Sequence, residues 1–418
     1  MYCPCMAPDQ WMTSEAAAAR LGVKRETLYA YVSRGAVRSE RMPGERRSRF
    51  LRADVERLAA RQRSGGRAGG LELIIETDLT LLEPAGALYY RGWDVERAVA
   101  EGASFEQVAG WLWSADRSPA TFGAPAAMLA SARRVADALA DQPLMDRMRA
   151  VVAAARHTDP LRDDRRPEAV GMTGRALIAT LVESLPVVSG AAPPPAGAAV
   201  AERLWSRLSP VPARPPLVRL LDTALVLLAD HELAASTLAA RVAASTWADP
   251  YLVVQAGLAA LGGPLHGGAS AAARRLIREV DAGESGPAVA VGNRLRDRQR
   301  IPGFGHRVYR ERDPRAEVLL QALAAAGHPL RAEHELLATM RERGLPFPNV
   351  DFAIAALAER HRMVDEAGEV VFAVARTAGW LAHAAEEYRH SLRFRPRATY
   401  TGPAPVGRGI SPSVGGAR

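Results

Sequence analysis

Cysteine is scarce in this sequence of 418 residues, and its scarcity excludes several classes of protein. Cys3 and Cys5 are the only two, and they form the triplet Cys-Pro-Cys near the N-terminus. Without a second pair, the chain can build neither a disulfide framework nor a four-cysteine zinc site. We therefore predict a protein of a reducing compartment, the cytoplasm.

Long apolar runs and aromatic residues are also lacking. No run reaches the roughly 18 apolar residues of a membrane span, and the start, MYCPCMAPDQW, lacks the basic-then-apolar pattern of a signal peptide. Aromatic residues make up 6% of the chain, and Ala and Leu outnumber Ile and Val. This composition favours helices over strands throughout.

Apolar residues and basic residues are what the sequence does contain. The apolar fraction is 48%, enough for a large core, and the length predicts two or three domains. The net charge is +8, and residues 1–67 hold 14 Lys and Arg against 7 Asp and Glu. Nearly all of the excess positive charge thus lies in the first sixth of the chain, which indicates an anionic partner for that segment.

Residues 1–63 are predicted to form a small domain of two helices, a hairpin and a third helix. Thr13 or Ser14 can cap a helix over SEAAAARL that ends at Gly22, and a second helix is expected at about residues 24–33. The segment RSERMPGERRSRFL alternates around a Pro-Gly turn, as a hairpin does. The last helix, DVERLAARQR, is expected to begin at its Asp.

This segment resembles the winged helix-turn-helix of excisionases and mercury-resistance-type regulators. The residues that carry the resemblance are SEA (14–16), LGV (21–23), TLY (27–29) and the Arg-rich wing that ends in Arg49-Phe50. In that fold the second helix enters the major groove of DNA, usually as part of a dimer. The resemblance implies DNA contacts from the second helix (Lys24, Arg25, Thr27 and Tyr31) and phosphate contacts from the wing (Arg46, Arg47 and Arg49). The alternative is a helical bundle whose basic face contacts proteins.

A Gly-rich linker, SGGRAGG (64–70), is expected to separate this module from residues 71–418. Strand-like pieces, LELIIETD and GALYYRG, begin the larger region, and helices follow. A capping box is predicted at Ser104–Gln107, an exposed loop at 190–198, and a helix with one apolar face at 216–230. Rossmann, P-loop and HExxH motifs and internal repeats are missing, so we predict a mainly α fold.

Seven polar residues stand in apolar or glycine-rich surroundings in this larger region. Each has a structural explanation: a lone His is usually a core residue, the Asp can cap a helix, and a buried Arg can pair with an acid. Together they are harder to explain structurally, because buried charges need partners and three arginines exceed what one Asp neutralises. Forked guanidinium groups suit a ligand that carries several carboxylates. The seven are His231, His266, His306, Arg315, Asp351, Arg376 and Arg395.

From about residue 71 to 402 the chain resembles citrate synthase. The matching motifs are LYYRGWDVERA, ADHELAAST, GGPLHGGA, GFGHRVYRERDPRA, PNVDF, RTAGWLAH and RPRATYTG, in family order. The resemblance implies an all-α fold of a large and a small domain, the small one at roughly 266–375. It also implies an acyltransferase of the tricarboxylic acid cycle that forms citrate from acetyl-CoA and oxaloacetate.

The resemblance assigns a role to each of the seven residues. Asp351 would remove a proton from the acetyl methyl group, and His266 would donate a hydrogen bond to the enol oxygen. His306 would polarise the ketone and protonate the new alkoxide. The carboxylates of oxaloacetate would be held by His231, Arg315, Arg376 and Arg395. The last of these would cross into the partner subunit's site, so a homodimer is expected.

Coenzyme A is expected to bind a glycine-rich loop, by the same resemblance. The loop consists of Ile301, Pro302, Gly303, Phe304 and Gly305, and Arg310 would meet a CoA phosphate. The alternative for Arg310 is a solvated charge. No cofactor and no metal are expected.

Three departures from the family pattern leave the substrate open. The chain has Ala234, Ala269-Ser270-Ala271 and Ala353-Ile354 where common members have other, often larger residues. These smaller residues can widen the pocket for propionyl-CoA, so 2-methylcitrate is the alternative product. A second alternative is a DNA-binding metabolite sensor, and a third combines enzyme and DNA binding. The set of His266, His306 and Asp351 argues against a sensor, which would need no base.

Overall fold

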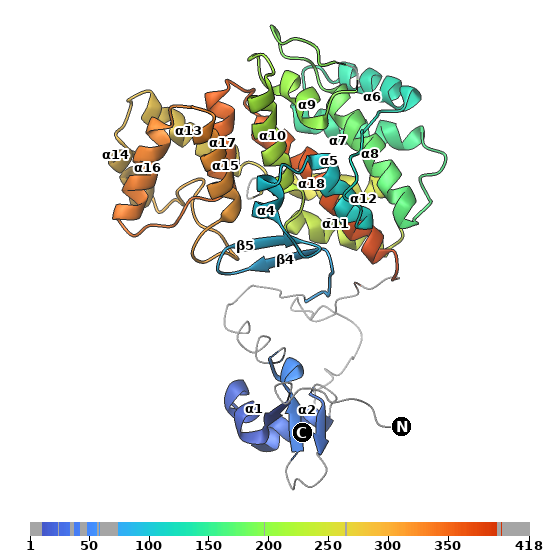
Figure 1. The fold of residues 1–418 in the computed structure, drawn as a ribbon, viewed down its shortest axis with the longest axis vertical. Helices are drawn as coiled ribbons and strands as arrows, with labels where there is room; N and C mark the ends of the chain where they lie inside the picture. The colour runs from blue at the N-terminus through green and yellow to red at the C-terminus, as the bar shows by residue number, and fades with distance from the viewer. Residues whose placement is uncertain are drawn as a thin grey trace, which may run out of the picture. The chain divides into compact units, whose positions relative to one another are not determined.

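The structure, a computed structural model, describes residues 11–23, 25–33, 37–41, 48–56, 58, 74–195, 197–263, 266–390 and 394. The chain divides into two compact units, residues 1–76 and 77–418 (Figure 1). The predicted linker falls outside the described residues.

The smaller unit combines a three-stranded antiparallel sheet with helices. Its strands have the order β1-β3-β2, so the predicted hairpin is confirmed, with Glu40 opposite Arg49. The short strand β1 was not expected. The elements are β1 (Trp11–Thr13), α1 (Ser14–Leu21), α2 (Arg25–Ser33), β2 (Ser39–Arg41) and β3 (Ser48–Leu51).

Local capping fixes the first helix where the sequence predicts it. The Thr13 hydroxyl accepts a hydrogen bond from the backbone N–H of Ala16, and Gly22 ends the helix at φ +64°. Leu28, Phe50 and other side chains form a small core. Each large apolar side chain buried there contributes roughly 1.5–3 kcal/mol.

The prediction that Asp54 begins the third helix is wrong. Helical residues start at Arg52, directly after β3, so Asp54 lies inside the helix. Its carboxylate is buried and accepts hydrogen bonds from the backbone N–H and the guanidinium group of Arg38, both at 2.9 Å. The Asp54 carboxylate therefore links its helix to Arg38, just before β2, and does not cap the helix.

The larger unit begins with a second antiparallel sheet of order β4-β5-β6, formed by Thr80–Glu83, Ala87–Tyr90 and Trp93–Asp94. The strand predicted in GALYYRG is confirmed as β5. The strand predicted in LELIIETD is wrong for its described part, residues 74–78, which forms no strand. Thr77 and the Asp78 backbone N–H donate hydrogen bonds to Glu386 instead, at 3.3 and 2.9 Å, so this segment is held by a distant helix.

Helices make up the rest of this unit, which confirms the predicted mainly α class. They are α4 (Val95–Ala100), α5 (Phe105–Ser114), α6 (Ala126–Ala138), α7 (Leu144–His157), α8 (Pro167–Ser184), α9 (Val200–Leu208), α10 (Pro215–Leu228), α11 (Ala235–Ser245), α12 (Pro250–Leu261), α13 (Ala269–Asp281), α14 (Pro287–Arg296), α15 (Pro314–Ala325), α16 (Arg331–Glu342), α17 (Val350–Arg360) and α18 (Ala367–Glu387). None of the described helices is long and apolar enough to cross a membrane.

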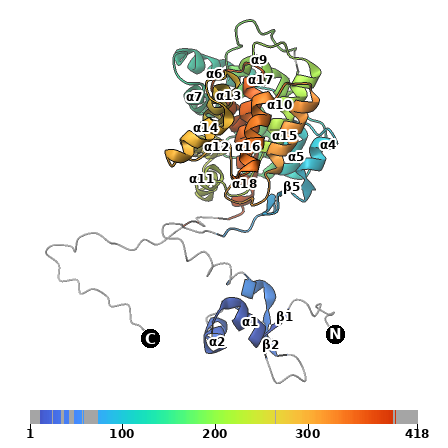
Figure 2. The same ribbon diagram turned by 90° about the vertical axis from the view of Figure 1, so that its left-hand side faces the viewer.

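The long helix α18 is the centre of this unit, and it packs against α5, α8, α10, α11 and α12. Helices α13–α17 gather on one side, at the left of Figure 1, and Figure 2 faces that side. Gly257 lets α12 approach α18 closely, because a Cβ there would lie 2.5 Å from the Trp380 indole.

Three further local predictions can be compared with the structure, and two of them are confirmed. The capping box at Ser104 is present in full, and the described part of the loop at 190–198 is mostly exposed. Helix α10, however, is buried on all sides from Leu220 to Leu228, not on one apolar face. It even buries Asp222, which accepts a hydrogen bond from the Phe105 backbone N–H at the start of α5.

Candidate active site

Six of the seven candidate residues lie in the described part of the chain, and Arg395 does not. Three loops and three helices supply them. His231 follows α10, His266 follows α12, and His306 precedes α15, whereas the helices α15, α17 and α18 carry Arg315, Asp351 and Arg376.

These six residues converge on one site. The imidazole rings of His231 and His306 have centroids 5.1 Å apart, with Tyr309 against both. Burial, then the charges of Arg315 and Arg376, hold the pKa of His231 well below its usual range. Burial, then the charge of Arg376, lowers the pKa of His266 to about 4.

His306 has a defined tautomer. Its Nδ1 accepts hydrogen bonds from the backbone N–H groups of Val308 and Tyr309, both at 3.1 Å. These two donors favour the tautomer with the proton on Nε2, and the 3.4 Å contact of the Arg315 Nη2 atom with Nε2 is then not a hydrogen bond, because both atoms would be donors. Burial is the main cause that lowers the pKa of His306 to about 4, so the ring is neutral at pH 7 with an Nε2–H donor.

His266 is held by a serine that the sequence analysis did not select. The Ser236 hydroxyl lies 2.9 Å from the His266 Nε2 atom. Ser236 belongs to the ADHELAAST motif, so that motif carried the signal. Gly267 follows the histidine, and a Cβ there would lie 2.5 Å from the Leu261 carbonyl oxygen, so this turn requires glycine.

Asp351 does not cap its helix, so that alternative is wrong. The cap of α17 is Asn349, whose side chain accepts a hydrogen bond from the Asp351 backbone N–H at 3.0 Å. The half-buried Asp351 carboxyl group makes no hydrogen bond with other described residues. Burial raises its pKa to about 6, which the charge of Arg315 partly offsets.

Arg315 has a partner of its own. Asp313 caps α15, and it also accepts two hydrogen bonds from the Arg315 guanidinium group, at 2.9 and 2.8 Å. The expectation that one Asp must neutralise three arginines is therefore wrong, because Arg315 has an acid beside it in the first turn of α15.

Arg376 is the opposite case. Its side chain is fully buried, and its Nε donates a hydrogen bond to the Leu228 carbonyl oxygen at 2.9 Å. Both terminal nitrogens lack a partner among the described residues. Arg376 therefore forms no ion pair with a buried acid among the described residues, so that alternative is not supported. Burial lowers its pKa to about 10, and the charge of Asp230 raises it.

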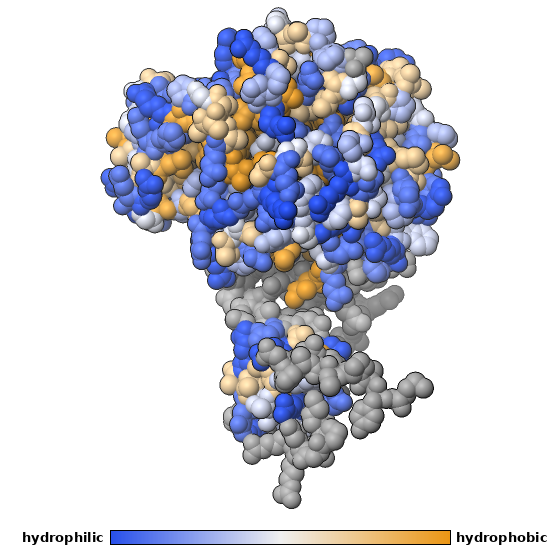
Figure 3. Space-filling model, in the orientation of Figure 1, coloured by the Kyte–Doolittle hydropathy of each residue, from blue (hydrophilic) through white to orange (hydrophobic). Residues whose placement is uncertain are grey.

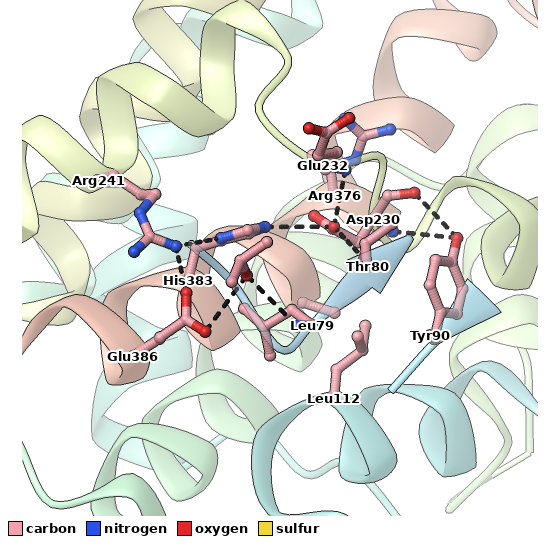
Figure 4. A network of polar contacts seen from close by, with 12 residues as sticks. Leu79, Thr80, Tyr90, Leu112, Asp230, Glu232, Arg241, Arg376, His383 and Glu386 are labelled. Carbon is pink, nitrogen blue, oxygen red and sulfur yellow. Dashed lines mark hydrogen bonds and ion pairs between the residues drawn. The ribbon is translucent and has the colours of Figure 1, made fainter. Parts of the chain in front are cut away.

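Asp230 belongs to a buried polar network (Figure 4). Its Oδ2 accepts hydrogen bonds from the Thr80 hydroxyl at 2.6 Å and from the Glu232 backbone N–H at 3.1 Å, and lies 3.3 Å from the Nε2 of His383. Arg241 donates to Nδ1 of that histidine at 2.8 Å, so the ring donates its Nε2 proton to Asp230. The network fixes an acid beside Arg376.

Arg241 closes the far end of this network. Its guanidinium group is fully buried and pairs with both Glu386 and Glu387, the latter at 2.7 Å. Breaking such a buried pair leaves an uncompensated charge. The network therefore depends on this arginine.

The predicted CoA loop is braced from behind by residues 347–349. Asn349 donates its backbone N–H to the Gly303 carbonyl oxygen and its side-chain N–H to that of Gly305, both at 2.9 Å. Both glycines have positive φ, +81° and +78°, which explains why they are glycines. The side chain of Arg310 is exposed, and its backbone N–H donates to the Pro84 carbonyl oxygen.

Several buried polar atoms at the centre of the site have no hydrogen-bond partner. Buried polar atoms ordinarily have such partners, so a group of unpaired ones can face a bound ligand, an ion or ordered water. In the part of the chain that the structure describes, they include the two terminal nitrogens of Arg376, the Nε2 of His231, the hydroxyl of Tyr309 and the Oδ1 of the neighbouring Asp230. No group of described His, Cys, Asp and Glu residues could hold a metal ion.

The predicted DNA-contacting residues are placed only in part. Arg25 pairs with Glu15, Thr27 is exposed, and Tyr31 is half-buried against the small core. Arg49 lies half-buried on β3. The others, Lys24, Arg46 and Arg47, fall outside the described residues.

Comparison with known proteins identifies both units. Residues 70–397 match the family model of the citrate synthase C-terminal domain, and residues 11–63 match that of a helix-turn-helix domain. The chain is 32% identical to the citrate synthase of Haloferax volcanii over 370 residues, which cover 81% of this chain and 97% of that one. It is 37% identical to citrate synthase 2 of Bacillus subtilis over 212 residues, 49% of this chain and 56% of that one.

Solved structures agree with this result. One is the ternary complex of citrate synthase from Thermoplasma acidophilum with carboxymethyl coenzyme A and oxaloacetate, with a TM-score of 0.63, 26% identity, and coverage of 84% of this chain and 98% of that one. Citrate synthase from Pyrobaculum aerophilum has a TM-score of 0.64, 27% identity, and coverage of 80% and 92%. The chain thus belongs to the citrate synthase family of condensing acyltransferases and carries an N-terminal helix-turn-helix domain.

Proposed function

We propose that this protein is a cytoplasmic citrate synthase, which joins acetyl-CoA to oxaloacetate and hydrolyses the thioester to citrate and CoA. The unpaired buried donors around Arg376 carry the proposal. Oxaloacetate has two carboxylates and a ketone, all hydrogen-bond acceptors, so it would satisfy the two terminal nitrogens of Arg376 and, in the tautomer with its proton on Nε2, His231. Arg315 and Arg395 would complete the carboxylate site.

Asp351 is proposed as the base. Its carboxylate would take a proton from the methyl carbon of acetyl-CoA, while His266 donates a hydrogen bond to the thioester oxygen as the enol forms. A pKa of about 6 leaves Asp351 ionised at pH 7 but more basic than an exposed carboxylate. Because His266 is neutral at pH 7, it can donate this hydrogen bond and keep its proton.

His306 is proposed as the acid. The enol carbon attacks the ketone carbon of oxaloacetate, a carbon–carbon bond forms, and the ketone oxygen becomes an alkoxide. The Nε2–H of His306 would first polarise this oxygen and then protonate it, and the two backbone N–H groups at Nδ1 fix the ring in the tautomer that can do so. Water would then cleave the thioester and release citrate and CoA.

The loop Ile301–Gly305 and Arg310 are proposed to bind CoA. The brace from Asn349 supports this role, because it holds the loop backbone in one conformation next to the helix that carries Asp351. Residues of roughly 266–375 would form a small domain that closes over both substrates.

A homodimer is proposed for the assembled enzyme. Helix α12 packs against both α11 and α8, and large apolar side chains stay exposed on or beside these three helices, although hydrophilic residues predominate on the face in Figure 3. These side chains are Met172, Val242, Trp247 and Leu252. A second copy would cover them. Light scattering of the full chain tests this assembly. A monomeric mass at the protein concentration of the activity assay would contradict it.

The alternative product is 2-methylcitrate, made from propionyl-CoA. The reason is the small residues at the departures from the family pattern, of which Ser270 on α13 and Ala353 on α17 are buried. Release of free CoA thiol from acetyl-CoA or propionyl-CoA, each with oxaloacetate, decides between the two. Higher kcat/KM with propionyl-CoA would move the assignment to 2-methylcitrate synthase.

Asp351→Asn is the variant for this assay. Turnover that collapses in the variant supports the proposed base, and unchanged turnover contradicts it. A folded protein with no turnover of either thioester would contradict the enzyme and favour a sensor on the same fold.

DNA binding is proposed for the N-terminal unit. Its support is the match to a helix-turn-helix family and the hairpin that follows α2, together with the excess of basic residues in 1–67. We expect salt-dependent binding to duplex DNA that disappears when residues 1–67 are deleted. Binding that survives the deletion would contradict the proposal.

A further inference from the structure

Tyr309 is buried in the middle of the site, and its side chain has no role in the proposed reaction. Only 2% of the residue is exposed. Its ring centroid lies 4.6 Å from that of His306 and 5.5 Å from that of His231, and the Arg315 guanidinium carbon lies 5.6 Å from the ring. The tyrosine therefore stands between residues from α15, from the loop before it, and from the loop after α10.

The hydroxyl group of Tyr309 has no hydrogen-bond partner among the described residues, although it is fully buried. Other buried tyrosines show the usual arrangement: the Tyr90 hydroxyl bonds backbone oxygens near Asp230, and the Tyr251 hydroxyl donates to Asp159 at 2.8 Å. An unpaired buried hydroxyl weakens the empty protein, so a purely structural role would be served better by phenylalanine.

The hydroxyl group is a permanent donor. Burial raises the pKa of Tyr309 to about 12, so the group keeps its proton across the physiological range. The charges of Arg315 and Arg376 lower this pKa in part. A donor near such cations, with the Arg315 guanidinium carbon 5.6 Å from its ring, suits an acceptor that carries negative charge.

We propose that the Tyr309 hydroxyl group donates a hydrogen bond to a carboxylate of the bound keto acid, next to the free terminal nitrogens of Arg376. Tyr309 is then a substrate-binding residue that favours a dicarboxylic keto acid. This role rests on the proposed function, because it needs the keto acid in this site.

The test is Tyr309→Phe in the full chain, with Tyr251→Phe as the matched control. Oxaloacetate binding is measured by titration calorimetry, turnover by thiol release, and stability by thermal melting. We expect Tyr309→Phe to raise the Kd and KM for oxaloacetate by about 10- to 100-fold, the loss of one hydrogen bond to a charged group, and to leave the KM for the thioester within about twofold.

The two variants should behave in opposite ways. Tyr309→Phe removes a hydroxyl that has no partner in the empty protein, so its Tm should be unchanged or higher. Tyr251→Phe breaks a bond to Asp159, so its Tm should fall by a few degrees while its oxaloacetate affinity stays at the wild-type value.

Three results would overturn the inference. If Tyr309→Phe binds oxaloacetate with the Kd of the wild type, the hydroxyl has no role in binding and the proposed function still stands. A wild-type protein that neither binds nor turns over oxaloacetate refutes the proposed function itself. A Tm that falls in Tyr309→Phe as far as in Tyr251→Phe, with unchanged Kd, makes the hydroxyl structural.

Discussion

Replacing Asp351 with asparagine should make the protein more stable and much less active. Burial raises the pKa of this carboxyl group from 3.8 to about 6, so the folded protein disfavours the charged form. About two pKa units at 1.36 kcal/mol each correspond to roughly 3 kcal/mol. Solvent reaches part of this half-buried side chain and screens the charge, so we expect about 1–3 kcal/mol.

The pH dependence gives this prediction its sign. The folded-state pKa lies above the unfolded one, so the stability that the protonated group contributes is complete below about pH 3.8. It is lost as the pH rises through about 6. Asparagine has no such dependence. The difference in unfolding free energy between Asp351→Asn and the wild type should therefore favour the variant more at pH 7.5 than at pH 4.

The assay is urea unfolding at pH 4, 5, 6 and 7.5, combined with thiol-release kinetics. Turnover of Asp351→Asn should fall by about 10²- to 10⁴-fold, the usual contribution of a general base, and wild-type turnover should decline below about pH 6. Asp365→Asn is the control, since its side chain is 87% exposed, and it should change stability by less than about 0.5 kcal/mol. An Asp351→Asn protein that is less stable at pH 7.5 than the wild type would refute the reasoning from burial.

Two further predictions concern the packed interior. Arg241→Met leaves the buried carboxylate of Glu387 without its cation and should cost about 3–5 kcal/mol of unfolding free energy; a loss below about 1 kcal/mol in urea unfolding would show that the network relaxes. Gly257→Ala places a Cβ 2.5 Å from Trp380 and should cost about 1–3 kcal/mol. The control Gly292→Ala, which meets nothing within 4 Å in α14, should be neutral or stabilising by up to about 1 kcal/mol. Equal midpoints for the two alanine variants would contradict the packing argument.

The features that sequence predicted well depend on a few neighbouring residues. The Thr13 cap, the Gly22 terminus and the capping box at Ser104 each involve atoms no more than a few residues apart, so residue types and spacing suffice. The polar candidate residues could also be found from the sequence, because a charged residue within an apolar or glycine-rich stretch needs a structural or functional explanation. That these residues lie in one site was predicted from the family motifs, not from their spacing along the chain.

The features that sequence missed depend on contacts between distant parts of the chain. Residues 74–78 have the composition of a strand, but Thr77 and Asp78 donate hydrogen bonds to Glu386 in α18. Asp54 is a residue type that often caps helices, yet its carboxylate accepts a hydrogen bond from Arg38 instead. Tyr309 could not be selected from the sequence, because an aromatic residue ordinarily belongs to the core. That its hydroxyl has no hydrogen-bond partner is known only from the structure.

Asn349 has a consequence for how this site tolerates mutation. One side chain caps the helix of Asp351, and it also fixes the carbonyl group of Gly305, while its backbone N–H fixes that of Gly303. Substitutions at these positions should therefore show strong epistasis, with double variants that lose little more than the worst single one. In evolutionary terms, the proposed CoA loop and the proposed base are expected to change together, because a lineage that alters Asn349 loses a hydrogen bond to each.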